Sequence, residues 1–160
     1  MVFETLDLTT DSDRVAALFQ AASDYVELES GQPPTHQTVV DFFEERPPTL
    51  TADDTHHIGI VENGRLVGIT GLCFGYPQTS DCYIGMLIFE PAARGQQLGR
   101  KTVDHVAAIA QSRGATRLLV AVLDANPKGR AFWARNGFVL EQTFPPSDDA
   151  HTRHRMIRTL

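Results

Sequence analysis

A short turn between a strand and a helix constrains the fold of this chain more than any other feature. Residues 86–89 are an apolar run typical of a buried strand, and Pro91 ends it because proline donates no N–H to a sheet. The segment 94–100, with glycines at 95 and 99, then leads into a stretch with helical periodicity. Such a turn leaves N–H groups unpaired at the positive end of a helix, where phosphate oxygens bind. The stretch predicts an anion site, but it also fits an ordinary strand-to-helix turn.

Two other kinds of phosphate-binding loop are excluded by spacing. The sequence contains neither the Gly-x-x-x-x-Gly-Lys-Ser/Thr pattern of nucleoside-triphosphate loops nor the Gly-x-Gly-x-x-Gly pattern of dinucleotide sites. An anion bound at this turn therefore belongs to some other ligand.

Length and composition indicate one soluble domain over residues 1–160. The chain has 160 residues, 42% of them hydrophobic and 21% charged, which is ordinary for a globular protein. The net charge of −6 argues against nucleic acid as a partner and fits a cationic small substrate better. No apolar run is long enough to span a membrane, and no signal stretch opens the chain. We expect a cytoplasmic protein without a membrane partner, and reduced thiols at Cys73 and Cys82.

Hydrophobic periodicity divides the rest of the chain into strands and helices. Thr10 is expected to cap a first helix that reaches Val26, and Thr35 a second helix that Pro47 stops. Asn63-Gly64 is the strongest two-residue signal for a type I′ hairpin turn. Two further helices are expected, from about residue 98 to Gly114 and from Asn126 to Gly137. The expected strands are 2–8, 57–61, 66–74, 82–89, 117–123, 138–144 and 153–160.

The order of these elements predicts an α/β (α+β) fold. Strand 82–89, the helix from about residue 98 and strand 117–123 form a βαβ unit, so these two strands should be parallel. We expect a mixed, mostly antiparallel sheet of six or seven strands around that central parallel pair, flanked by about four helices.

Two motifs make the chain resemble the GCN5-related N-acetyltransferase (GNAT) superfamily. Residues 94–99 resemble the family's acetyl-CoA signature, which is Arg or Gln, two residues, Gly, one residue, then Gly or Ala. Residues 126–138 resemble the Asn-x-x-Ala-x-x-Leu-Tyr-x-x-x-Gly-Phe ending of the family. Their order and separation, together with the strand order over nearly the whole chain, make the match specific.

The resemblance implies a single-domain GNAT fold and acetyl-CoA as co-substrate. Backbone amides of 95–100 would hold the pyrophosphate, and the backbone of 87–89 would pair with the pantetheine arm like an added strand. Asn126 would either hydrogen-bond the pantetheine, cap its helix, or do both. The implied cofactor-binding residues are Leu87, Ile88, Phe89, Arg94, Gly95, Gln96, Gln97, Leu98, Gly99, Arg100, Asn126, Gly129 and Trp133.

This chain departs from the family pattern at three positions. Gln97 replaces the middle glycine, which a negative φ would tolerate with altered phosphate contacts. Gly129 replaces an alanine, an exchange expected to be nearly neutral for packing against the cofactor. Trp133 stands where many members have the tyrosine that protonates the departing thiolate, and indole is no usable acid near neutral pH. Water or the product ammonium would then protonate the thiolate.

The resemblance implies direct attack of a neutral amine on the thioester, which requires a base. Asp81 lies where some relatives place a glutamate base, and Tyr83 shares its strand face two residues on. Trp133 shapes the thioester pocket, and a backbone N–H at a bulge in strand 82–89 would polarise the carbonyl. Solvation at the strand edge is the alternative reading of Asp81 and Tyr83.

The acceptor and the assembly are less constrained. Glu27, Glu29 and the 30–36 loop lie where the family builds its acceptor pocket, so acidic residues there could attract an ammonium group. The histidines at 56, 57, 151 and 154 lack a third ligand at suitable spacing, so we expect exposed histidines and no metal. A monomer and a homodimer are both compatible with the sequence.

Two functions of different class follow. The first is an acetyl-CoA-dependent N-acetyltransferase that transfers acetyl to a primary amine of a small molecule, peptide or protein, and an acyl group larger than acetyl stays open. The second is a non-catalytic acyl-CoA-binding regulatory module, supported only by Gln97 and Trp133. Fold-level analogy does not choose the amine.

Overall fold

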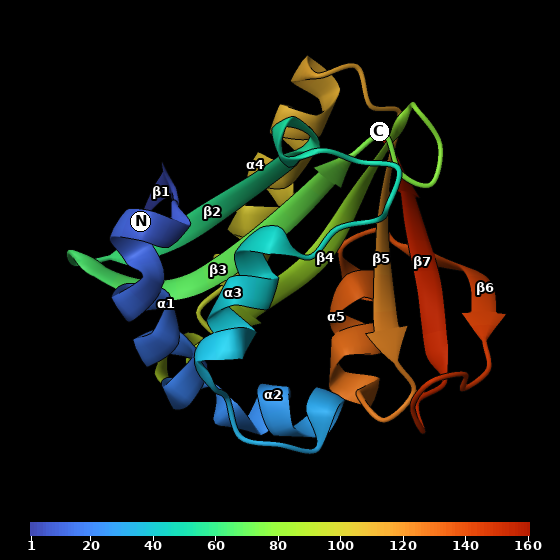
Figure 1. Ribbon diagram of the computed structural model, residues 1–160. Helices are drawn as coiled ribbons and strands as arrows, with labels where there is room; N and C mark the ends of the chain where they lie inside the picture. Colours follow the sequence, from blue (N-terminus) through green and yellow to red (C-terminus); the bar gives the residue numbers. More distant parts are fainter.

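The computed structural model describes all residues 1–160, with seven strands in one continuous sheet (Figure 1). The strands lie in the order β1-β2-β3-β4-β5-β7-β6. The strands are β1 (Val2–Thr5), β2 (Thr55–Glu62), β3 (Arg65–Phe74), β4 (Asp81–Phe89), β5 (Arg117–Leu123), β6 (Val139–Phe144) and β7 (Arg153–Thr159). The helices are α1 (Leu8–Ala21), α2 (Ser23–Ser30), α3 (His36–Glu44), α4 (Leu98–Ser112) and α5 (Pro127–Arg135).

The predicted fold class is confirmed. β4 and β5 are parallel, and every other neighbouring pair is antiparallel. The hairpin turn has positive φ at both Asn63 (51°) and Gly64 (75°), as a type I′ turn requires. Gly114, at φ 82°, follows the end of α4 in the left-handed conformation expected there.

The first predicted helix is two helices, which makes five in all instead of about four. Asp7, and not Thr10, caps α1, because its side chain accepts hydrogen bonds from the N–H groups of Thr9 and Thr10. The helical run breaks at Ala22, whose φ and ψ are −105° and 29°. Ala22 is fully buried, so the chain turns at a contact with the core and α2 leaves in a new direction.

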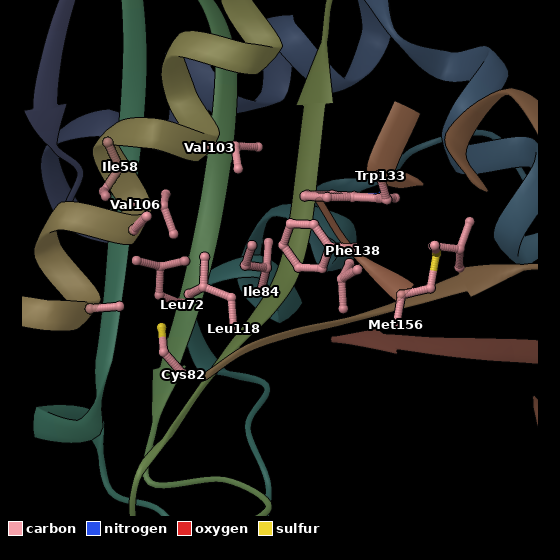
Figure 2. Close-up of a cluster of buried hydrophobic side chains, with 14 residues drawn as sticks. Ile58, Leu72, Cys82, Ile84, Val103, Val106, Leu118, Trp133, Phe138 and Met156 are labelled. Carbon is pink, nitrogen blue, oxygen red and sulfur yellow. The ribbon is translucent and has the colours of Figure 1, made fainter. Parts of the chain in front are cut away.

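The helices cover the two faces of the sheet. In Figure 1, α1 and α3 lie in front of the sheet and α4 lies behind it. On the α4 face, one core cluster joins the sheet to α4 and to Trp133 of α5, with Phe138 and Met156 beside them (Figure 2). A second cluster packs α1, α2 and α3 against the other face.

A bulge in β4 marks the centre of the sheet. Gly71 pairs with Met86 and Leu72 pairs with Ile84, so Gly85 has no partner residue on β3. The hydroxyl of Thr70, which is fully buried, donates a 2.7 Å hydrogen bond to the carbonyl of Met86 and holds the chain beside the bulge. The predicted bulge in this strand is confirmed.

The two parallel strands separate just beyond their pairing. Residues 81–84 of β4 pair with 117–120 of β5, and the pairing ends at Ile84. The remainder of β4 and of β5 therefore diverges, and the gap between them is the only place where the sheet opens.

The expectation of exposed histidines is wrong. His154 is 8% exposed and bonds Asp124 and Thr143, while His57 packs against the rings of Phe42 and Phe43. No group of three metal-ligating side chains occurs in the structure. These residues serve packing and hydrogen bonding, which a sequence pattern does not reveal.

Stability is expected to fall on mild acidification because of His57. Burial lowers the pKa of this imidazole from 6.5 to about 4. Since the unfolded chain takes up its proton first, the contribution of neutral His57 is present above pH 6.5 and is lost as pH falls towards 4. Urea unfolding at pH 7 and pH 4.5 should show that His57→Leu loses about 2 kcal/mol less stability over this interval than the parent chain. An equal loss in both proteins would contradict the assignment.

Candidate functional site

A cavity of about 630 Å³ fills the gap between the diverging strands. One side is the bulged half of β4, and the other is the end of β5 with the turn into α5. Helix α2 closes the cavity on the face that carries α1 and α3. The lining residues are Asp24, Tyr25, Leu28, Gly85, Met86, Leu87, Ile88, Phe89, Arg94, Gly95, Val120, Ala121, Val122, Leu123, Ala125, Asn126, Lys128, Gly129, Phe132, Trp133 and Arg135.

The cavity continues into a second hollow at the start of α4. This hollow measures about 660 Å³ and shares five lining residues with the first, Phe89, Arg94, Gly95, Phe132 and Arg135. The first N–H groups of α4, at residues 98–100, have no partner within the helix and lie at its positive end. Arg94, Arg100 and Arg135 also line the hollow, and Asp24 balances the charge of Arg94. Unpaired N–H donors beside the charges of Arg100 and Arg135 are groups that an anion would require.

Two residues of the turn have left-handed backbone. Gly95 has φ 78°, and a Cβ added there would meet nothing within 4 Å, so the space above it is open to a ligand. Gln97 has φ 61°, which corrects the expectation of a negative φ. The turn needs this conformation to bring the chain into α4, whichever side chain stands there.

Replacing Gln97 by glycine should stabilise the protein. A left-handed non-glycine residue costs roughly 1–2 kcal/mol, and the greater flexibility of glycine when unfolded returns part of that. The expected gain is about 0.5–1 kcal/mol in urea unfolding, with no loss of affinity for an anionic ligand at the turn. Gln96→Gly is the control because Gln96 does not have positive φ, and this variant should be destabilised. Destabilisation of both variants would show that the side chain of Gln97 outweighs its strain.

Asn126 caps α5 and also faces the cavity. Its Oδ1 accepts a 2.9 Å hydrogen bond from the N–H of Gly129, so the capping role is confirmed. A Cβ at Gly129 would lie 2.5 Å from the Asn126 Nδ2. The exchange of alanine for glycine at 129 is therefore not neutral here, because alanine would displace the cap.

The aromatic residues of α5 form the wall beside α4. Trp133 is 6% exposed and packs edge-on against Phe138, at a centroid distance of 4.9 Å (Figure 2). It packs in the same way against Phe132, at 5.0 Å. A Cβ at Gly99 would approach the ring of Phe132 to 2.8 Å, so glycine permits the close contact of the two helices. Trp133 combines a core position with a place on the cavity wall.

An ion pair joins α2 to the turn before α4. Arg94 donates to both carboxylate oxygens of Asp24, at 2.5 and 2.9 Å, and its Nε donates to the carbonyl of Phe89 at 3.0 Å. Both charged residues line the cavity. The pair fixes α2 across the opening between the strands.

The structure brings together most of the residues singled out in the sequence, but not all. Leu87–Phe89, Arg94, Gly95, Asn126, Gly129 and Trp133 line the first cavity, and Gln97–Arg100 line the hollow beside it. Gln96 lines neither, and its side chain donates to the carbonyl of Ala92. Asp81 and Tyr83 also lie outside the lining.

Asp81 is neither solvated nor directed at the cavity. Its side chain is fully buried, and Arg117 donates two hydrogen bonds of 2.8 Å to its two oxygens. The N–H of Gln78 donates a third, at 3.1 Å. The carboxylate thus joins the first residues of β4 and β5.

Sequence reasoning missed Tyr25, which α2 places on the cavity wall. Burial, and then the carboxylate of Glu29, raises the pKa of this phenol. Partial burial also raises the pKa of Glu29, against the opposing effect of Arg153. Tyr25 does not belong to the apolar helix face formed by residues 15, 18, 19, 22 and 26. Only a helix break at Ala22 would have indicated that its side chain faces the cavity.

Comparison with known proteins supports the motif evidence. Residues 15–138 match the model of the acetyltransferase (GNAT) family. An acetyltransferase from Thermus thermophilus superposes with a TM-score of 0.82 at 23% identity, covering 100% of this chain and 98% of that chain. The ribosomal-protein-S18-alanine N-acetyltransferase of Escherichia coli gives 0.73 at 17% identity, covering 99% and 92%. An aminoglycoside 6'-N-acetyltransferase complexed with coenzyme A gives 0.74 at 14% identity, covering 99% and 97%.

At these identities the structural matches demonstrate the fold, and the family model carries the assignment. No curated protein matches the sequence significantly. The family match spans more than half of the chain and includes the bulged strand, the turn and the α5 motif. The chain belongs to the GNAT family of N-acetyltransferases.

Proposed function

We propose that this protein is an acetyl-CoA-dependent N-acetyltransferase that transfers the acetyl group directly from the thioester to a primary amine of a small molecule or peptide. One observation supports the proposal: a cavity opens between two diverging parallel strands and adjoins a hollow at the start of α4, where the first N–H groups of the helix have no partner within it. A long ligand with an anionic end and a reactive end fits that shape. One neighbouring structure holds coenzyme A.

The turn and the strand supply the contacts for the co-substrate. The open space at Gly95 and the free N–H groups at the start of α4 suit the pyrophosphate, with Arg100 and Arg135 nearby. Residues 87–89 of β4 lie beyond Ile84, where the pairing with β5 ends. Their backbone groups on that side are therefore available to pair with the pantetheine amides. Asn126 keeps its Nδ2 for the same ligand, because the cap uses only Oδ1.

The reaction needs four events at the inner end of the cavity. The ammonium of the acceptor loses one proton, its nitrogen bonds to the acetyl carbon, the C–S bond breaks, and the nitrogen gives up a second proton while the thiolate takes one up. A backbone N–H at the Gly85 bulge would stabilise the developing oxyanion. Trp133 shapes the pocket beside the sulfur without supplying a proton, so solvent or the released proton protonates the thiolate.

The base is expected among groups that reach the acceptor side. Asp81 is committed to Arg117, which leaves it no lone pair directed at the cavity. Tyr83 has a pKa raised to about 12, chiefly by burial and then by Tyr76, and phenolate is therefore scarce at neutral pH. Glu29 also lies outside the lining, but it follows Leu28 of the lining, and its carboxylate, whose pKa burial raises, is the better candidate for accepting the ammonium proton directly or through water.

We place the reaction in the cytoplasm. Cys73 and Cys82 are free thiols, as a reducing compartment favours. No helix has both the length and the apolar character needed to cross a membrane.

Calorimetric titration with acetyl-CoA, CoA and ATP, followed by thiol release with a panel of amines, tests the proposal. Binding of acetyl-CoA and CoA but not ATP, with thiol release that depends on an amine, is the expected result. Binding without thiol release for any amine would replace the transferase by the non-catalytic acyl-CoA-binding module. Absence of binding would overturn both.

A further inference from the structure

Two arginines stand beside the open end of the cavity, on the face of the sheet away from α4. Met156 of β7 belongs to the core on the α4 side, so its neighbour Arg155 and also Arg153 point to the other face. In the register, Arg155 lies opposite Ala121 and Arg153 lies opposite Leu123. Ala121 and Leu123 both line the cavity, and directly opposed residues have Cβ atoms about 4.5–5.5 Å apart. No helix covers β5 and β7 on this side (Figure 1).

Acidic partners hold both guanidinium groups in fixed positions. Asp149 accepts two hydrogen bonds from Arg153, at 3.0 and 2.6 Å, through the two terminal nitrogens, which leaves Nε for a ligand. Arg155 pairs with Glu141. The side chains remain 34% and 17% exposed, so neither charge is shut off from an incoming molecule.

All three tyrosines of the chain gather around these arginines. Tyr76 packs edge-on against Tyr83 with ring centroids 5.6 Å apart, and Tyr83 pairs with Leu119 on the same face as the arginines. Burial raises the pKa of both Tyr25 and Tyr83, and Arg153 lies close enough to each phenol to oppose that rise. No hydrogen bond within the protein involves these hydroxyl groups. Phenols and guanidinium N–H groups are donors that match a carboxylate, which only accepts.

A carboxylate without a partner lies beside the same opening, one residue beyond Leu28 of the cavity lining. Glu29, near the end of α2, makes no side-chain hydrogen bond or ion pair, although Arg153 lies near enough to lower its pKa. The ring of His151 bonds the backbone carbonyl of Glu29 at 2.9 Å, which ties the loop before β7 to α2. The α2 side therefore offers an unpaired carboxylate, and the β7 side offers guanidinium and phenol donors whose positive charges Asp149 and Glu141 balance.

We propose that the acceptor is a zwitterion, a small amino carboxylate such as an amino acid. Its ammonium lies beside Glu29, and its carboxylate lies against Arg153 and the neighbouring phenols. This inference rests on the proposed function and adds to it the class of acceptor. An opening with an acceptor on one side and hydrogen-bond donors on the other orients such a molecule with the amine towards the inner end of the cavity, and an amine without a carboxylate makes only the contact with Glu29.

The test compares pairs of acceptors that differ in one group. α-Amino acids, glycine, β-alanine and 4-aminobutyrate are each assayed with acetyl-CoA beside their carboxamides, which keep the amine and lose the negative charge. The readout is the acid-to-amide ratio of kcat/KM in the parent chain divided by that ratio in Arg153→Gln. Differences in amine basicity cancel in this quotient. Arg158→Gln is the matched control, because Arg158 lies on the other face of β7 and donates to the carbonyl of Asn136.

For the preferred acid, Arg153→Gln should lower the acid-to-amide ratio about tenfold or more, with CoA affinity unchanged. Arg158→Gln should leave the ratio within about twofold. Should Arg153→Gln not fold, Arg155→Gln is expected to lower the ratio in the same direction. An unchanged ratio in the arginine variants, or turnover of simple amines and amides but not of any amino carboxylate, overturns the zwitterion and leaves the transferase standing. Failure of the transferase itself would instead appear as the absence of thiol release with every amine tested, acids and amides alike.

Discussion

Replacing Arg117 with methionine is expected to cost about 3 kcal/mol or more of unfolding free energy. The change leaves the Asp81 carboxylate, which is fully buried, without its two hydrogen bonds from the guanidinium. Removing one partner of a buried pair costs roughly 3–5 kcal/mol, and the lower end applies because the Arg117 side chain is 25% exposed. Urea unfolding at pH 7 measures the loss.

The double variant Asp81→Leu with Arg117→Met is the control for this prediction. An apolar pair of similar volume removes the stranded charge, so it should recover more than half of the lost stability. A loss of less than about 1 kcal/mol of unfolding free energy in Arg117→Met would mean that water reaches Asp81 and that the ion pair contributes little to stability.

The ion pair between Asp81 and Arg117 also leads to a prediction about the role of Asp81 in the reaction. Asp81→Asn keeps the shape of the side chain and removes its charge, so the protein should be destabilised while kcat of the folded fraction stays within about twofold at all pH values. Loss of kcat in a fully folded Asp81→Asn protein would return Asp81 to the mechanism.

The sequence predicts the parts of this molecule that local chemistry determines. Asn63-Gly64, Gly114 and Asn126-Pro127 each fix a turn or a cap through their own backbone preferences, and the structure has all three where expected. The βαβ unit follows from hydrophobic runs and connection length, so the parallel pair of β4 and β5 was also predictable. The turn from β4 into α4 was predictable from the same kind of local evidence.

The features that could not be predicted depend mostly on contacts between segments that are far apart in the sequence. The break at Ala22 depends on burial against the core, and it turns Tyr25 towards the cavity. The sequence places Asp81 at the start of a strand, where solvent exposure is the usual expectation. In the structure the parallel register brings Arg117, 36 residues away, beside it. The left-handed Gln97 is a local feature, yet glutamine carries no signal for positive φ. A single sequence holds no direct record of such pairings.

The affinity for CoA should depend strongly on Gly95 and not on Gly114, although both glycines have nearly the same backbone. Their φ angles are 78° and 82°, and a Cβ on either would meet no protein atom within 4 Å. Alanine at either position therefore pays the same left-handed penalty, roughly 1–2 kcal/mol in urea unfolding. Only at Gly95 does the new methyl group enter the space above the turn where we place the pyrophosphate.

The expected result is a loss of CoA affinity of about tenfold or more in Gly95→Ala and no change in Gly114→Ala, measured by calorimetry. Because the two substitutions match in backbone cost, a difference between them measures the blocked phosphate contact and not the stability of the fold. Equal affinities in the two variants would remove the pyrophosphate from this turn. The transferase proposal would then need another anchor for its co-substrate, and Arg100 and Arg135 in the adjoining hollow would be the residues to replace next.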